Sequence, residues 1–244
     1  MLTRIINFKK IKFYECSYKY VKKILFEKKG YLVIPAASAL SEINNKIYYE
    51  ALRKSTIAIF DSGYFCLSLL FLKFIKVKKF SGYKFIKKFI NDSSLKKFKI
   101  LLLEPSLKAA NHNKLFLKSK KFIFIKNYVC PIYNKNNYHD LALIKLISDY
   151  KPAIIIINIG GGSQELLANY INNKLKKKYV IICSGAALSF HTGHGARINT
   201  FVDSLYIGWL LRIFDNPIIF IQRIFLSLKL AKIVYRTDIK ISYE

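Results

Sequence analysis

The segment at residues 154–165 (IIIINIGGGSQE) constrains the fold of this chain more than any other part of the sequence. Its run of isoleucines is typical of a strand that is buried on both faces of a parallel sheet. The glycines that follow, Gly160, Gly161 and Gly162, expose backbone N–H groups, and a helix then begins near Ser163. The segment therefore predicts an α/β sheet that binds an anionic, phosphate-bearing ligand at a strand end.

The same pattern recurs at residues 180–187 (VIICSGAA). Val180–Cys183 is expected to form a second buried strand, which is followed by Ser184, Gly185 and Ala186. Two such strand ends side by side form a crevice, and this is the usual ligand site of an open α/β sheet. We therefore expect the two loops to contribute to one site.

Strand and helix patterns alternate along the rest of the chain. Short apolar runs bounded by turn residues predict further strands at residues 31–35, 57–60, 100–103 and 122–125. Helical patterns are found at residues 41–54, 82–90, 106–117 and 140–150. The longest apolar stretch, residues 64–72, is too short to span a bilayer and is expected to be a buried helix. The alternation favours an α/β fold with a Rossmann-like, doubly wound and mostly parallel sheet.

The character of the chain changes after residue 196. Residues 1–196 are expected to form the α/β domain, and residues 197–244 a helical, basic and amphipathic C-terminal appendage. On a helical wheel Lys229, Lys232 and Arg236 share one narrow face. Most of the remaining surface of that helix is apolar and comprises Phe225, Leu226, Leu228, Leu230, Ile233 and Val234. Its cover is left open between the core, a partner subunit and an anionic bilayer surface.

Net charge says little about partners in this chain. The formal charge is +28, but only six of the 42 basic residues are arginine, and lysine is spread over the whole sequence. A nucleic-acid-binding protein is an alternative that rests on charge alone, because no helix-turn-helix, zinc finger or aromatic platform is evident. Arg197, Arg212, Arg223 and Arg236 lie late in the chain, and this clustering favours a site for phosphate contacts.

Neither metal nor disulfide chemistry is indicated. The cysteines are far apart and form no CxxC pair, which favours a reduced, cytosolic compartment. His191 and His194 have glycine neighbours and no acidic or cysteine partner, so we predict no metal site there. The N-terminal residues lack the apolar core and cleavage site of a secretory signal, and none is expected.

An ordered set of motifs resembles one known family. They are FDSG with Asp61, GGGSQE with Gln164 and Glu165, SGAALSF, then Arg197, and finally GWLLR with Trp209 and Arg212. In this order and spacing the chain, over about residues 32–236, resembles the WecG/TagA/CpsF glycosyltransferases, glycosyltransferase family 26. Three positions depart from the family pattern: residues 36–38 replace its Asn element, Gly162 its proline, and Ser189 an Asp. The departures resemble a subgroup with GGGxQE loops.

The resemblance implies an activity. Members transfer an N-acetylhexosamine-type sugar, such as a ManNAc-like one, from a UDP donor to a lipid-diphosphate-linked sugar acceptor, with inversion, in the synthesis of cell-surface polysaccharide or glycan. No metal or other cofactor is expected. By the same resemblance residues 1–196 form the catalytic domain and Asp61 is the base that accepts the proton of the acceptor hydroxyl. The alternative for Asp61 is an N-cap of the following helix.

Further site roles follow from the same resemblance. The UDP donor would be bound by Gly160, Gly161, Gly162, Ser163, Gln164, Glu165, Ser184, Gly185 and Ala186, through backbone N–H groups and side chains. The acceptor diphosphate would be bound by Arg197, Arg212 and Arg223. The alternative for Gln164 and Glu165 is that they are first-turn helix residues.

The expected partners are the UDP-sugar, a lipid-linked acceptor and an anionic membrane surface. The protein would be cytoplasmic and attached peripherally to the inner face of the cell membrane, and self-association is expected from its apolar appendage. No nucleic acid is expected. A non-catalytic nucleotide-sugar-binding relative is an alternative, because the family Asn is missing. A nicotinamide-dependent oxidoreductase is a weaker one, since GGGSQE is not a GxGxxG fingerprint.

Overall fold

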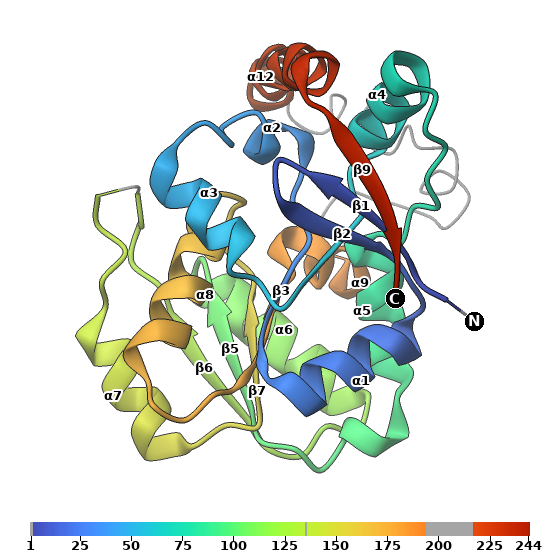
Figure 1. Ribbon diagram of the computed structural model, residues 1–244. Helices are drawn as coiled ribbons and strands as arrows, with labels where there is room; N and C mark the ends of the chain where they lie inside the picture. The colour runs from blue at the N-terminus through green and yellow to red at the C-terminus, as the bar shows by residue number, and fades with distance from the viewer. Residues whose placement is uncertain (1, 135, 194–216) are drawn as a thin grey trace.

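The computed structural model describes residues 2–134, 136–193 and 217–244, the stretch 217–224 as backbone only. The strands join into one sheet in the order β6-β5-β7-β8-β3-β4-β2-β1-β9 (Figure 1). They are β1 (Arg4–Phe8), β2 (Ile11–Glu15), β3 (Gly30–Val33), β4 (Ile57–Ile59), β5 (Ile100–Glu104), β6 (Ile125–Val129), β7 (Ile154–Ile157), β8 (Val180–Cys183) and β9 (Ile239–Tyr243).

The helices lie between the strands in sequence and cover the sheet. They are α1 (Tyr18–Lys28), α2 (Ala37–Leu40), α3 (Lys46–Arg53), α4 (Gly63–Lys73), α5 (Gly82–Asn91), α6 (Leu107–Ser119), α7 (Leu141–Tyr150), α8 (Ser163–Lys174), α9 (Ser189–Thr192) and α12 (Pro217–Arg236). From β6 to β2 every pair of neighbouring strands is parallel, whereas β1 pairs antiparallel with both β2 and β9. The expected Rossmann-like, doubly wound and mostly parallel fold is confirmed.

The continuous apolar runs of the central strands are explained by two cores, one on each face of the sheet. Successive side chains of a strand point to opposite faces. Ile155 and Ile157 of β7 therefore lie in a core with α3, α4, α7, α8 and α12, whereas Ile154 and Ile156 lie in a core with α1, α5 and α6. A strand buried on both faces needs apolar residues at every position, and the isoleucine run supplies them.

The structure corrects two predicted elements at the edges of the sheet. The strand predicted at residues 122–125 instead begins at Ile125, because Phe122 turns into the core, where it stacks on Phe89 of α5. The hairpin of β1 and β2 was not predicted at all. Its turn places Lys9 and Lys10 at positive φ angles of 49° and 64°. Gly and Asn are the usual sequence signals for such a turn, and neither occurs at these two positions.

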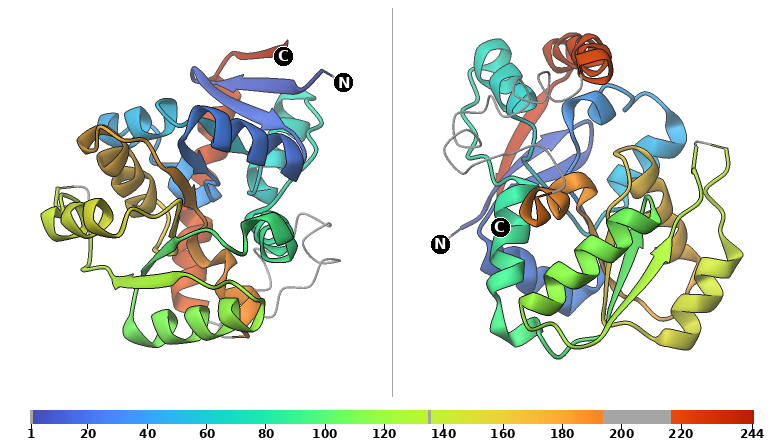
Figure 2. Two further views of the ribbon diagram at one scale, coloured as in Figure 1. Left: turned by 90° about the horizontal axis from the view of Figure 1, so that it is seen from below. Right: turned by 180° about the vertical axis from the view of Figure 1, so that it is seen from behind.

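The C-terminal residues also differ from the prediction of a purely helical appendage. Residues 239–243 form β9, which pairs with β1 along the edge of the sheet. Helix α12 contacts α2 and α4, and the views agree in placing α4 and α12 side by side (Figures 1 and 2). Leu230 and Val234 of α12 are fully buried in the core. The described part of this region is therefore built into the α/β domain, and the predicted boundary at residue 196 lies outside the described residues.

The apolar face of α12 is covered only in part. The core takes Leu230 and Val234, but Phe225 is 66% and Leu228 52% exposed. In the described part of the chain, no helix is both long enough and apolar enough to cross a membrane.

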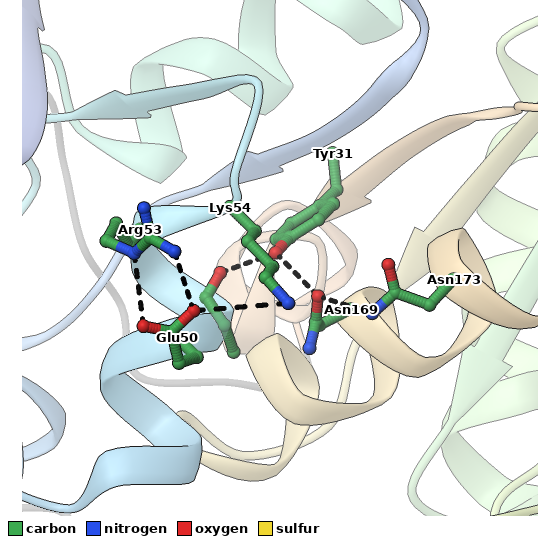
Figure 3. A network of polar contacts seen from close by, with 7 residues as sticks. Tyr31, Glu50, Arg53, Lys54, Asn169 and Asn173 are labelled. Carbon is green, nitrogen blue, oxygen red and sulfur yellow. Dashed lines mark hydrogen bonds and ion pairs between the residues drawn. The ribbon is translucent and has the colours of Figure 1, made fainter.

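A buried tyrosine ties two helices to the central sheet (Figure 3). Tyr31 of β3 donates its hydroxyl to the carbonyl of Ala51 in α3 at 2.5 Å, and Asn169 Oδ1 of α8 lies 3.3 Å from the same hydroxyl. Asn173 holds that oxygen in place with an amide hydrogen bond of 3.0 Å. The network joins the helices that follow β3 and β7, and it thereby positions the loops at the ends of these strands.

We expect Tyr31→Phe to lower the free energy of unfolding by about 1 kcal/mol, because a buried carbonyl loses its side-chain partner. Tyr48→Phe is the matched control, since Tyr48 is equally buried but its hydroxyl has no hydrogen-bond partner among the described residues. That substitution should leave the unfolding free energy unchanged or raise it. Urea unfolding followed by circular dichroism measures both, and equal losses in the two variants would contradict the prediction.

Candidate active site

The carboxyl ends of the parallel strands surround a cavity of about 980 Å³. Five of its lining residues come just after five different strands. They are Ile34 after β3, Asp61 after β4, Pro105 after β5, Asn158 after β7 and Ser184 after β8. Loops at this edge of a parallel sheet carry the ligand sites of α/β proteins.

The strand order explains why the cavity opens here. The chain leaves β5 towards β6 and leaves β7 towards β8, in opposite directions along the sheet. The helix after β5, α6, therefore packs on one face and the helix after β7, α8, on the other, as Leu117 and Leu167 show by belonging to different cores. Such a reversal leaves a crevice between the two strand ends.

The glycine loop lies at this crevice as predicted, but part of it is already bonded. Gly160, Gly161, Gly162 and Ser163 all line the cavity. Gly162 has a φ of +94°, a backbone conformation that residues other than glycine adopt only with strain. Its N–H donates to Glu165 Oε2 at 2.7 Å and therefore points away from a ligand. No hydrogen bond to a described residue occupies the N–H groups of Gly160 and Gly161.

Gln164 and Glu165 join the two predicted loops to each other. Glu165 is fully buried behind the glycine loop and does not line the cavity. Its Oε1 accepts from Gln164 Nε2 at 3.1 Å, and Gln164 Oε1 in turn accepts from the N–H of Gly185 at 2.8 Å. Burial raises the pKa of Glu165, and the hydrogen bonds oppose that rise. Both residues are in the first turn of α8, and they hold the loops after β7 and β8 together.

The second loop also faces the cavity. Ser184, Gly185 and Ala186 all line it, next to the glycine loop. Because Gly185 gives its N–H to Gln164, that group serves the protein and not a ligand. Of the predicted backbone donors, those of Gly162, Gly185 and Ser184 are thus part of the framework, the last because it donates to the carbonyl of Ile157 at 3.0 Å.

Asp61 lines the same cavity as these loops. It is half-buried, and its Oδ1 accepts from the N–H of Gly82, the first residue of α5, at 2.8 Å. It does not cap the helix that follows it: Ser62 does, by accepting from the N–H of Phe65 at 3.1 Å. The alternative of an N-cap on α4 is therefore wrong, and the carboxylate is oriented by another helix at the cavity wall.

Sequence reasoning missed a polar network beneath the cavity. Glu104, at the end of β5, is fully buried and accepts from Asn158 Nδ2 at 2.7 Å and from Asn113 Nδ2 at 2.9 Å. Asn158 Oδ1 accepts from the hydroxyl of Ser184 at 2.6 Å. Burial raises the pKa of Glu104, and the two amides oppose that rise. The available signal was the polar residue that ends each apolar run, Glu104 after ILLL and Asn158 after IIII.

A loop between β6 and α7 forms another wall that was not predicted. Tyr133, Asn134, Asn136 and Asn137 line the cavity from this loop. Its base is held by Asp140, which accepts from the hydroxyl of Tyr133 at 2.6 Å. Burial raises the pKa of Asp140, but hydrogen bonds from both tyrosine and backbone donors outweigh it, and the net shift is downward.

Several of the predicted site residues have no described side chain, and His191 belongs to no metal cluster among the described residues. Arg197 and Arg212 are outside the described residues, and Arg223 lies on α12 where only the backbone is described. The role of these arginines stays a prediction. His191 stacks on Tyr83, with ring centroids 4.4 Å apart. Within the described ranges, no cluster of His, Cys, Asp and Glu could hold a metal ion, and the four cysteines are free.

Fold and cavity together define a doubly wound α/β protein with its site at the point where the strand order reverses. The model of the Glycosyl transferase WecG/TagA/CpsF family matches residues 5–241, and the chain belongs to that family. No curated protein matches the chain. The family is one of glycosyltransferases, which supports a role in glycosyl transfer.

The buried charge of Glu165 leads to a pH-dependent prediction. Because its folded-state pKa is raised, the ionised carboxylate costs stability at neutral pH, and protonation removes this cost. Relative to Glu165→Gln, the wild type should gain unfolding free energy as the pH falls from neutral to about 5. Urea titrations at the two pH values measure the difference.

The matched control for this prediction is Glu50→Gln. A hydrogen bond from Arg53 lowers the pKa of the partly exposed Glu50, so the sign of its effect is opposite. The wild type should keep its stability relative to this variant from neutral pH to about pH 5, because the ordinary pKa of Glu is 4.5, and should lose it only as the pH falls further. The prediction for Glu165 is wrong if its variant follows the wild type at both pH values.

Proposed function

We propose that this protein is an inverting glycosyltransferase that moves an N-acetylhexosamine-type sugar from a UDP donor to a lipid-diphosphate-linked acceptor. The observation that carries the proposal is one cavity lined by both Asp61 and the loops after β7 and β8. Family membership supports glycosyl transfer, and the cavity supports a ligand as large as a nucleotide sugar.

Asp61 is proposed as the general base. An acceptor hydroxyl loses its proton to the carboxylate as its oxygen bonds to the anomeric carbon, and the bond from that carbon to the UDP oxygen breaks on the opposite face. The hydrogen bond from Gly82 holds the carboxylate in one orientation towards the cavity wall. Fixed orientation matters because a base must meet the hydroxyl at hydrogen-bond distance.

The departing UDP gains negative charge, which needs preorganised donors. The N–H groups of Gly160 and Gly161, next to the N-terminus of α8, are suited to this task. Arg197, Arg212 and Arg223 are proposed to supply cationic contacts, in particular to the acceptor diphosphate. No metal ion or other cofactor is included in the proposal.

A lipid-linked acceptor requires the cavity to be near a membrane, and the surface formed by α4 and α12 is suited to this. Phe74, at the end of α4, is 91% exposed, and Phe71 is 70% exposed. The neighbouring α12 adds Phe225 and Leu228, and its Leu226 lines the cavity itself. Lys229, Lys232 and Arg236 are exposed on the same helix. We propose that this apolar and basic surface attaches the protein peripherally to anionic lipid on the inner face of the membrane.

Asp61→Asn should reduce UDP release from the cognate UDP-sugar by about 10²- to 10⁴-fold, because the general base is lost, while UDP binding stays near wild type. The assay is UDP release across a panel of UDP-sugars with an undecaprenyl-diphosphate-sugar analogue. Ser62→Ala is the control, because Ser62 only caps α4, and it should lose stability but keep its activity.

Two outcomes of this assay would oppose the proposal. Full activity of Asp61→Asn would remove the base from the mechanism. Binding of a UDP-sugar by wild type without release of UDP from any donor would favour a non-catalytic relative.

The double variant Phe71→Ser/Phe74→Ser should weaken binding to vesicles with anionic lipid by about tenfold or more, because two exposed apolar side chains are lost from the bilayer contact. Ile123→Ser is the control, since Ile123 is exposed but precedes β6 at the opposite edge of the sheet. Sedimentation with vesicles measures both variants. Equal binding by wild type and the double variant would contradict membrane attachment through this surface.

A further inference from the structure

The carboxylate of Glu104 has no cationic partner in the described part of the chain, although it is fully buried. Its partners are instead two amide groups, from Asn113 on α6 and Asn158 after β7. A buried ionised carboxylate is costly unless hydrogen bonds satisfy it, so the arrangement calls for a reason beyond packing. That reason is found in what Glu104 imposes on its neighbours.

An ionised carboxylate only accepts hydrogen bonds, whereas an Asn side chain can present either its oxygen or its nitrogen. Glu104 therefore forces Asn158 to present its amide nitrogen, at 2.7 Å. The amide oxygen of Asn158 must then point the other way, where it meets the hydroxyl of Ser184 at 2.6 Å. The carboxylate thus determines the direction of both hydrogen bonds in the relay that runs from Glu104 through Asn158 to Ser184.

The hydroxyl of Ser184 has one hydrogen, and the protein uses it. The carbonyl of Ile157, at 3.2 Å, is the more distant acceptor for this hydrogen, and it already accepts from the N–H of Ser184 at 3.0 Å. Ser184 lines the cavity, and a hydroxyl whose hydrogen is already used has only lone pairs left for a ligand. A ligand hydrogen-bond donor is matched at this point, and an acceptor is repelled.

We infer that Glu104, acting through Asn158, makes Ser184 an acceptor that recognises an O–H or N–H group of the bound ligand. The inference rests on the proposed function for the class of ligand, a UDP-sugar, whose sugar and nucleoside both carry such groups. Glu104 and Asn158 are positioning residues here, and Ser184 is the binding residue. Their place supports a ligand contact, because Glu104 ends β5 and Asn158 follows β7, the two strands that flank the reversal of strand order.

A double-mutant cycle tests the relay. Calorimetric titration with UDP and with UDP-N-acetylglucosamine gives Kd for wild type, Ser184→Ala, Glu104→Gln and the double variant. Each single change should weaken binding by about five- to tenfold, the usual effect of one lost hydrogen bond. A Gln at position 104 lets the Asn158 amide turn over and donate to Ser184, which takes up one of the hydroxyl's two lone pairs and releases its hydrogen from Asn158. The double variant should be no weaker than Ser184→Ala, because both changes remove the same contact.

The two ligands separate the sources of the recognised group. If the loss is seen with both, the group belongs to the nucleoside; if it is seen only with the UDP-sugar, the group belongs to the sugar. The control cycle pairs Glu104→Gln with Ser163→Ala, because Ser163 also lines the cavity but donates to the carbonyl of Tyr133, outside the relay. Its effects should be additive.

Unchanged affinity in either single variant, or additive losses in the Glu104 and Ser184 cycle, would overturn the inference and leave the proposed function standing. Absence of UDP and UDP-sugar binding by the wild type would instead overturn the proposed function and the ligand named here with it. Thermal unfolding shows whether each variant is folded. Should Glu104→Gln not fold, Asn158→Ala takes its place in the cycle with the same expected coupling to Ser184.

Discussion

The reversal of strand order between β5 and β7 is the constraint on which the rest of this structure depends. Right-handed connections in a parallel sheet place a helix on the face that the direction of travel dictates. Because the chain leaves β5 and β7 in opposite directions, α6 and α8 pack on opposite faces of the sheet. The ends of β5 and β7 are therefore left uncovered. The cavity, the glycine loop and the buried network beneath Ser184 all follow from that one gap.

Around this gap, the protein holds its shape with amides where other proteins would use ion pairs. Glu104 and Glu165 are both fully buried, and each is satisfied by Asn, Gln or backbone N–H donors. An amide donates from its nitrogen and accepts at its oxygen, whereas a lysine ammonium can only donate. Each hydrogen bond to an amide therefore fixes which way that amide points. The result links three loops, after β5, β7 and β8, into one rigid floor. A glycosyl transfer site benefits from this rigidity, because its donors must be in place before charge develops.

The C-terminal residues extend from the core and the cavity to the surface of the molecule. Helix α12 buries Leu230 and Val234 in the core, presents Leu226 to the cavity and leaves Phe225 exposed. Strand β9 then anchors the helix by pairing with β1 at the edge of the sheet. An exposed apolar surface on the helix that also lines the cavity suits the proposed acceptor, which has a lipid at one end and a diphosphate sugar at the other.

The sequence by itself determined the α/β class, the positions of β3, β4, β5, β7 and β8, and the two cavity loops that follow β7 and β8. These features are local, because an isoleucine run that ends in Gly160, or a strand that ends near Asp61, can be recognised from a few consecutive residues. The tertiary structure alone decided that β9 joins β1, that Gly82 orients Asp61, and that Glu104 meets Asn158. Each of these is a pairing between distant segments, and residue type carries no record of the partner, since the packing of the sheet and its helices chooses it.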